Sequence, residues 1–159
     1  MSNCTIFKVA LANLRMKAEM ERAAQAIIDG MKTAILNKVG VDGSKVEENE
    51  VSTSDRKGFD HRMVDTGAYV KYGLTYKATD RSFIVAPKDR DHPGGKASYL
   101  QIAEWNQKGN DNVAVDKASN HFGLTKKAEE AAVKIVSDKI IEHLEKAITY
   151  KLVINKVVG

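Results

Sequence analysis

The chain has 159 residues, of which 43% are hydrophobic and 29% are charged, as expected for a globular domain with one core. The net charge of +4 arises from 25 basic and 21 acidic residues mixed along the sequence, which excludes a basic nucleic-acid arm. Cys4 has no second cysteine to pair with, no apolar run approaches the ~20 residues that span a bilayer, and we see no signal-peptide pattern. We therefore expect a cytosolic protein without membrane contact.

The first predicted element is a helix from about Ala10 to Val39. At 1.5 Å per residue it would be ~40 Å long and cross the whole body, with Gly40 as its C-terminal stop. Gly30 costs ~1 kcal/mol relative to Ala inside a helix, which predicts that another backbone approaches closely there. The apolar stripe of this helix consists of Met16, Met20, Ala23, Ala24, Ile27, Met31, Ala34 and Ile35.

A β-hairpin is predicted after a polar surface loop over residues 44–62. One strand is expected over residues 69–76, with a bulge at Gly73. Residues 78–81 form the turn, and residues 82–86, which are rich in β-forming residues, form the second strand.

Two further helices are predicted from their caps. Ser98 with Gln101 three residues later is a capping box that opens a short helix ending before Gly109. Thr125 caps a long helix that runs to about Ile148 and carries apolar residues at every fourth position from Ala128. The last residues, 150–157, have the composition of a β-strand.

These elements predict an α+β fold in which long N-terminal and C-terminal helices pack on a small, mainly antiparallel sheet. Residues 1–148 would form a single domain. Residues 149–159 would form a C-terminal strand or arm, and such an apolar strand at a free end either completes its own sheet or pairs with a neighbouring subunit.

The segment Asp65-Thr66-Gly67 is compatible with two chemistries. Asp-Thr-Gly after an apolar residue is how an aspartic protease presents its catalytic carboxylate. It is also an ordinary turn, in which Asp accepts backbone N–H groups and Gly relieves the steric limit on φ. A protease of this kind needs two aspartates that share a proton, from two lobes or two copies of a small β-chain. Long flanking helices favour the structural turn, and Asp65→Asn would discriminate between the two.

Other catalytic or ligand-binding chemistry finds little support. The four histidines (His61, His92, His121 and His143) lack metal-site spacing, so we expect no metal and no cofactor. No nucleophile has a recognisable partner and no glycine-rich phosphate loop follows a strand. Trp105 is typical of a core or interface anchor.

The order of motifs resembles the tail-completion and neck proteins of tailed bacteriophages, the head–tail joining group related to virion-morphogenesis proteins. The resemblance spans roughly residues 10–148. Its motifs are the Asp-Thr-Gly turn, the strand ending near 74–76, the segment from Tyr99 through Glu104-Trp105 to Gly109, and Phe122-Gly123-Leu124 before the last helix. In this chain residues 69–73 replace the Arg/Leu-rich strand that usually follows the turn.

The resemblance implies a non-enzymatic α+β subunit that forms a ring, commonly a hexamer, completing the tail and joining it to the head. Its partners would be other copies of itself, a portal-side adaptor or head-completion protein, and a tail-terminator or tail-tube protein. The net charge is compatible with non-specific contact with DNA in the channel. The protein would reside in the virion after assembly in the host cytoplasm.

The resemblance also assigns roles to individual residues. Asp65, Thr66 and Gly67 would be the structural turn. Candidate interface residues are Tyr99, Glu104, Trp105, Phe122, Leu152 and Ile154, and Phe122 would anchor the last helix. The alternatives are a tail-terminator subunit, a dimeric protease that uses Asp65, and a monomeric interaction domain.

Overall fold

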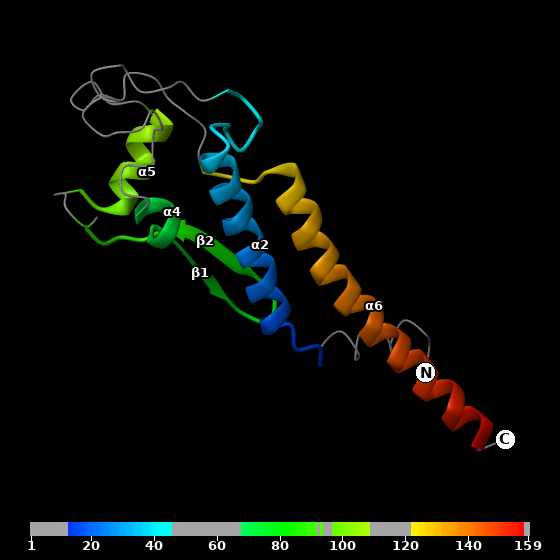
Figure 1. Ribbon diagram of the computed structural model, residues 1–159. Coiled ribbons are helices and arrows are strands. Elements are labelled where there is room, and N and C mark those ends of the chain that lie inside the picture. The colour runs from blue at the N-terminus through cyan, green and yellow to red at the C-terminus, as the bar shows by residue number, and fades with distance from the viewer. Residues whose placement is uncertain (1–12, 46–67, 92, 94–96, 109–121, 158–159) are drawn as a thin grey trace, which may run out of the picture.

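The computed structural model describes residues 13–45, 68–91, 93, 97–108 and 122–157. The chain has the predicted α+β class (Figure 1). Its elements, in chain order, are α2 (Lys17–Leu36), α4 (Ala68–Tyr72), β1 (Leu74–Ala78), β2 (Phe83–Pro87), α5 (Tyr99–Lys108) and α6 (Lys126–Val157).

The hairpin, α2 and α6 lie side by side in that order (Figure 1). Helix α2 packs against both strands of the β1–β2 hairpin, and α6 runs antiparallel to α2 on its other side (Figure 1). The short helices α4 and α5 contact β1 and β2, respectively. At 1.5 Å per residue, the 20 residues of α2 span about 30 Å and the 32 residues of α6 about 48 Å. Helix α6 therefore extends well beyond the body of the protein.

Helix α2 begins later than the apolar pattern suggests, because its cap comes from the hairpin. The backbone N–H groups of Met16 and Lys17 donate to Oδ1 of Asp80, at 3.0 and 3.1 Å. Asp80 lies in the β1–β2 turn and also forms an ion pair with Arg15 at 3.4 Å. Residues 13–16 are not helical, so the predicted start near Ala10 is wrong. A carboxylate at a helix N-terminus satisfies free N–H groups and interacts favourably with the helix dipole.

Helix α2 ends at Leu36 through a Schellman motif rather than at Gly40. The N–H of Val39 donates to the carbonyl of Ala34 at 3.0 Å, and the N–H of Lys38 donates to that of Ile35 at 3.1 Å. Lys38 occupies the left-handed position with φ of 58°, where glycine is the usual residue. Gly40 lies in the following turn, where its N–H donates to the carbonyl of Ser44 at 2.7 Å.

The predicted stripe of α2 is confirmed, since all eight of its members are buried. Ile28 and Glu19 are buried as well, and the carboxylate of Glu19 accepts a hydrogen bond from Arg22 at 3.0 Å. The prediction of a close approach at Gly30 is also confirmed. A Cβ at this position would lie 2.5 Å from Cβ of Ala128 on α6. Gly30 and Ala128 thus bring the two long helices into close contact.

The hairpin is confirmed, but its first strand is shorter than predicted. Residues 69–72 form the helical turn α4, which closes with a 2.8 Å bond from the N–H of Gly73 to the carbonyl of Tyr69. Any Cβ at Gly73 would lie 2.6 Å from that carbonyl oxygen, so the glycine ends α4 instead of forming a bulge. The antiparallel register then pairs Leu74 with Pro87 and Ala78 with Phe83.

Both predicted helix caps are present. Ser98 accepts the N–H of Gln101 at 3.2 Å, and the Gln101 side chain accepts the N–H of Ser98 at 2.9 Å. The Thr125 hydroxyl accepts the N–H of Ala128 at 3.2 Å. These bonds open α5 and α6 at the positions read from the sequence.

The predicted C-terminal strand is wrong, because residues 150–157 continue α6 to Val157. Extending an existing helix adds one hydrogen bond per residue without a new nucleus. A strand needs a partner, and within the described residues β1 and β2 pair with each other in a two-stranded sheet. β-Propensity depends on such surroundings more than helix propensity does.

Candidate interaction surfaces

The Asp65-Thr66-Gly67 segment lies outside the described residues. Its assignment as a structural turn, and the alternative of a catalytic aspartate, both stay predictions. The structure instead allows the candidate interface residues and the surfaces formed by the long helices to be placed.

Tyr99 is a core residue and offers no surface to a neighbour, so its assignment to an interface is wrong. Its side chain is 0% exposed and packs edge-to-face on Tyr69, with 6.1 Å between ring centroids. Apolar burial accounts for this position, because Tyr99 is the first residue of α5 and fixes that helix to the core. Burial also raises the pKa of the Tyr69 phenol above its ordinary value.

The other candidate interface residues lie at separate places. Glu104 is exposed on α5, and Trp105 follows it on the same helix. Phe122 packs against the core just ahead of α6, where an anchor for that helix would lie. Leu152 and Ile154 belong to the last turns of α6. The structure does not gather these residues into one site.

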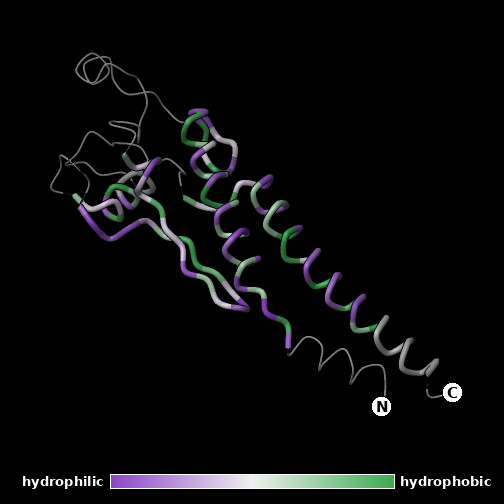
Figure 2. The backbone as a smooth tube through the Cα atoms, turned by 60° about the horizontal axis from the view of Figure 1, so that its bottom comes forward, coloured by the Kyte–Doolittle hydropathy of each residue, from purple (hydrophilic) through white to green (hydrophobic). Residues whose placement is uncertain are grey.

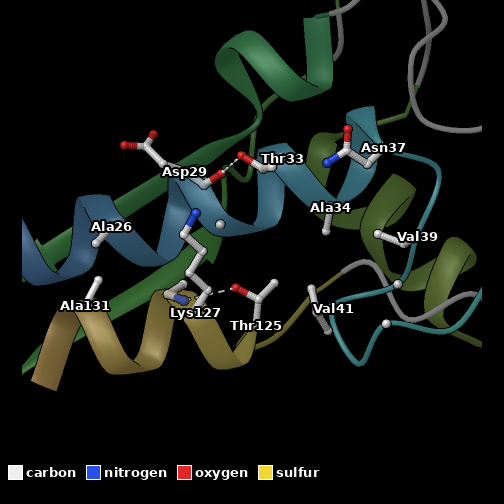
Figure 3. A pocket seen from close by; sticks show the side chains of 14 residues that line it. Ala26, Asp29, Thr33, Ala34, Asn37, Val39, Val41, Thr125, Lys127 and Ala131 are labelled. Carbon is white, nitrogen blue, oxygen red and sulfur yellow. Dashed lines mark hydrogen bonds between the residues drawn. The ribbon is translucent and has the colours of Figure 1, made fainter.

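An apolar groove lies where the C-terminal half of α2, the loop after it and the first turns of α6 meet (Figure 3). Its volume is about 540 Å³, which is within the size range of small-molecule and peptide-side-chain clefts. Small residues dominate its lining and leave the space open. They are Ala26, Gly30, Ala34, Val39, Gly40, Val41, Gly43, Ala128 and Ala131.

The groove has few polar groups, and those of Thr33 and Thr125 form hydrogen bonds with the backbone of their own helices. Thr33 donates its hydroxyl to the carbonyl of Asp29 at 2.7 Å, and Thr125 is the cap of α6. Asp29 and Lys127 are exposed and project from opposite helices (Figure 3). This arrangement lacks an activated nucleophile or an acid–base pair, and it suits aliphatic side chains of a partner better than a polar substrate.

A second, polar groove of about 320 Å³ separates the two helices further along, near the start of α2. It is lined by Glu19, Arg22, Ile135, Asp138, Lys139 and Glu142. Hydrogen bonds from Lys146 and Lys139 hold the pKa of the Glu142 carboxyl below its ordinary value. Exposed ion pairs of this kind contribute little to stability, so we regard this groove as a solvated seam.

The side of α6 that faces away from α2 carries a second apolar stripe, which we call the outer stripe. Its members are Val133, Ile141 and Ile148, which are exposed, and Ile140, Leu144 and Ala147, which are half-buried. At about 100° per residue, its centre lies roughly 160° from Ala128, which faces α2. Val133, Ile141 and Ile148 are 60%, 53% and 43% exposed. Figure 2 shows hydrophobic and hydrophilic residues alternating along this helix.

Among the residues that the structure describes, no three His, Cys, Asp or Glu side chains gather where they could hold a metal ion. Within those residues, no helix combines the length and the apolar character needed to cross a membrane. Comparison with family models, curated proteins and solved structures gave no match.

The groove and the outer stripe were missed when the sequence was considered alone. The groove depends on the crossing of α2 and α6, which local patterns do not specify. The outer stripe did have a signal, since Val133 and Ile141 fall outside the series of apolar residues that recurs at every fourth position from Ala128. A second apolar face on a helix either packs against another element or partner or is left exposed to solvent.

Proposed function

We propose that this chain is a non-enzymatic structural subunit of a tailed-phage virion. It would form a ring, of about six copies, at the neck, where it completes the tail and joins it to the head. The proposal starts from the resemblance of the motifs to tail-completion and neck proteins. Its neighbours would then be a portal-side adaptor or head-completion protein on one side and a tail-terminator or tail-tube protein on the other.

The observation that carries the proposal is the projection of α6 beyond the body. Helix α6 has 12 more residues than α2, which corresponds to about 18 Å at 1.5 Å per residue. Most helical stability in proteins comes from tertiary packing. In this proposal, the part of α6 that extends beyond α2 obtains such packing from a neighbouring molecule. A subunit that connects the head to the tail needs elements that extend from one subunit to the next.

The arm and the groove suit a head-to-tail contact. The arm, residues 149–157, is at the C-terminal end of α6, and the apolar groove is at the N-terminal end of the same helix. Two different surfaces that join successive copies generate a closed ring when the rotation between copies closes. In this proposal, the arm of one subunit, now a helix rather than a strand, docks in the groove of the next.

The experiment compares ring formation in the full chain and three variants by native mass spectrometry and negative-stain imaging, with and without virion components. Deletion of residues 149–159 and the groove-filling variant Ala131→Trp should each abolish the ring and leave folded subunits. Ala18→Trp is the matched control, because Ala18 is also an exposed helical alanine but lies outside the groove. A ring that persists in both variants, or a full chain that never forms one, would refute the proposal.

A further inference from the structure

The β1–β2 hairpin has two edges, and its register shows which backbone groups each edge presents. Within the described part of the chain, β1 and β2 form a sheet of two strands. The N–H of Lys88 donates to the carbonyl of Gly73 at 2.7 Å, and the N–H of Thr79 donates to that of Ser82 at 2.8 Å. Because the direction of these groups alternates along an antiparallel pair, every second residue of β1 points its backbone groups away from β2. These residues, which form what we call the β1 edge, are Leu74, Tyr76 and Ala78.

The edge of β2 is poorly suited to a further strand. By the same alternation its outward positions are Phe83, Val85 and Pro87, and proline has no N–H group to donate. Helix α5 also packs against β2. A strand that extends this sheet would therefore pair with β1.

The β1 edge is accessible in the described structure. Lys77 is exposed, and Thr75, Tyr76 and Ala78 are partly exposed. Helix α6 lies on the far side of α2 from the hairpin (Figure 1), and α4, which contacts β1, is separated from it along the chain by one residue. An open strand edge is a template for another strand, and a two-stranded sheet gains stability from further strands. The occupant of the β1 edge is therefore a β-strand.

The side chains of β1 favour a second copy of the same strand. Two identical antiparallel strands can be aligned in several registers that match their outward-facing groups. The register centred on Tyr76 overlaps all five residues of β1, and the others overlap fewer of them. It also sets Lys77 opposite Thr75 of the second copy, whereas a register centred on Lys77 would oppose two lysines. Like charges directly opposite each other destabilise a sheet.

We propose that β1 pairs antiparallel with β1 of a second copy of this chain in the register centred on Tyr76. The two hairpins then form one four-stranded sheet. Tyr76 pairs with Tyr76 of the second copy, and Leu74 pairs with Ala78 of the second copy. Each of these pairs exchanges two N–H···O bonds between the copies. Aromatic residues directly opposite each other add to the stability of the contact.

The length of the edge decides the strength of the pair. Five residues at about 3.3 Å each give a contact roughly 16 Å long. Stable complexes bury about 800 Å² of accessible surface on each partner, and a single short strand edge supplies less than that. The pairing is accordingly weak and reversible between free subunits, and it strengthens where an assembly holds two copies close together.

This pairing does not depend on the proposed ring. A two-fold contact uses the same surface on both copies and cannot by itself close a cyclic ring. It would join two free subunits, or two assembled rings through their hairpins. Deletion of residues 149–159 leaves the β1 edge in place, so that variant should retain the pair even where it loses the ring.

Disulfide trapping tests the register and detects a weak pair. Thr75 and Lys77 of two copies would form a non-hydrogen-bonded pair with Cα atoms about 4.5 Å apart, a separation that a disulfide spans. In a Cys4→Ser background, a mixture of Thr75→Cys and Lys77→Cys should give a covalent dimer with one copy of each, identified by its mass. Lys77→Cys alone should give little, because two residues of strand separate the cysteines. Ile84→Cys mixed with Lys77→Cys is the control for random collision, since Ile84 is 69% exposed on β2.

Sedimentation equilibrium of the full chain over a range of concentrations measures the affinity. Thr75→Lys should raise the dissociation constant by about tenfold, because it places a second lysine opposite Lys77 at two symmetric positions. Thr75→Glu should lower the dissociation constant by a similar factor. Ala86→Lys is the matched control, because Ala86 lies opposite Thr75 on β2 and away from the β1 edge. That variant adds the same charge and should leave the affinity unchanged.

Three results would overturn the proposal. The first is a full chain that stays monomeric at every concentration and gives no more trapped dimer than the collision control. The second is a dimer that Lys77→Cys alone traps as efficiently as the mixture, since this places the centre of the register at Lys77. The third is an equal loss of affinity in Thr75→Lys and Ala86→Lys. Circular dichroism of each variant verifies that the subunit remains folded.

Discussion

Replacing Gly30 with alanine tests whether the contact between α2 and α6 governs the stability of this fold. Helix propensity alone predicts that Gly30→Ala stabilises α2 by about 1 kcal/mol. The added Cβ, however, would lie 2.5 Å from Cβ of Ala128 and 2.9 Å from Oγ1 of Thr125. A Cβ bonded directly to the backbone cannot rotate away, so the helices must separate by about 0.9 Å to reach ordinary contact at 3.4 Å.

The cost of that separation exceeds the gain in propensity. Overpacking a well-filled contact costs about 1–3 kcal/mol. Displacement of Thr125 also weakens the cap of α6, and loss of a cap costs about 0.5–2 kcal/mol. We therefore expect Gly30→Ala to lower the free energy of unfolding by about 1–3 kcal/mol, although alanine is a better helix former than glycine.

Urea unfolding followed by circular dichroism measures this change. The variants Gln25→Ala and Gln25→Gly calibrate propensity, because both remove the exposed Gln25–Asp29 bond and differ only in the Ala-to-Gly preference within α2. The double variant Gly30→Ala/Ala128→Gly should recover part of the loss by relieving the contact. The difference in the free energy of unfolding between Gln25→Ala and Gln25→Gly measures the preference of α2 for alanine over glycine. If Gly30→Ala raises the free energy of unfolding by that same amount, the close approach of the helices is refuted.

Substitutions at three further residues test the ends of α2 and the buried tyrosine pair. Lys38→Gly should raise the free energy of unfolding by about 1 kcal/mol in urea titrations, because Lys38 has φ of 58°. Asp80→Ala should lower the melting temperature. The hydrogen bond from the Met16 N–H is the main cause that lowers the pKa of Asp80. The contribution of Asp80 to stability is therefore complete above its ordinary pKa of 3.8, and it is lost as the pH falls through the lowered pKa. Asp80→Asn should flatten this acid limb, and an unchanged limb would contradict the cap. Tyr69→Phe should change stability by less than about 1 kcal/mol at neutral pH, because the Tyr69 hydroxyl has no hydrogen-bond partner in the described structure. Its raised pKa predicts a loss of stability as the pH rises above the ordinary value of 10.0, which Tyr69→Phe removes in alkaline melts.

Several features of this fold follow from short-range patterns and could be predicted. The Ser98–Gln101 capping box and the Thr125 cap each join residues three positions apart. The hairpin turn depends on Thr79, whose hydroxyl accepts the N–H groups of Arg81 and Ser82. Such bonds form within one turn of chain, so the residue types suffice to place them.

The candidate surfaces were less accessible to prediction. Tyr99 was expected at an interface and lies in the core, since its neighbour Tyr69 comes from a separate segment. The groove exists because small residues from two helices distant in sequence meet at Gly30 and Ala128. Neither contact has a local signature.

The sequence by itself determined the α+β class, the hairpin, the starts of α5 and α6 and the buried face of α2, because hydrophobic periodicity and capping act over a few residues. Tertiary structure decided where α2 begins, since its cap, Asp80, is 64 residues away from Met16. It also decided the state of residues 150–157, whose composition favours a strand but which extend α6 to Val157. The physical reason is the same in both cases. A backbone N–H group or a strand pairs with whichever group the folded chain brings next to it. The local sequence does not specify which group that is.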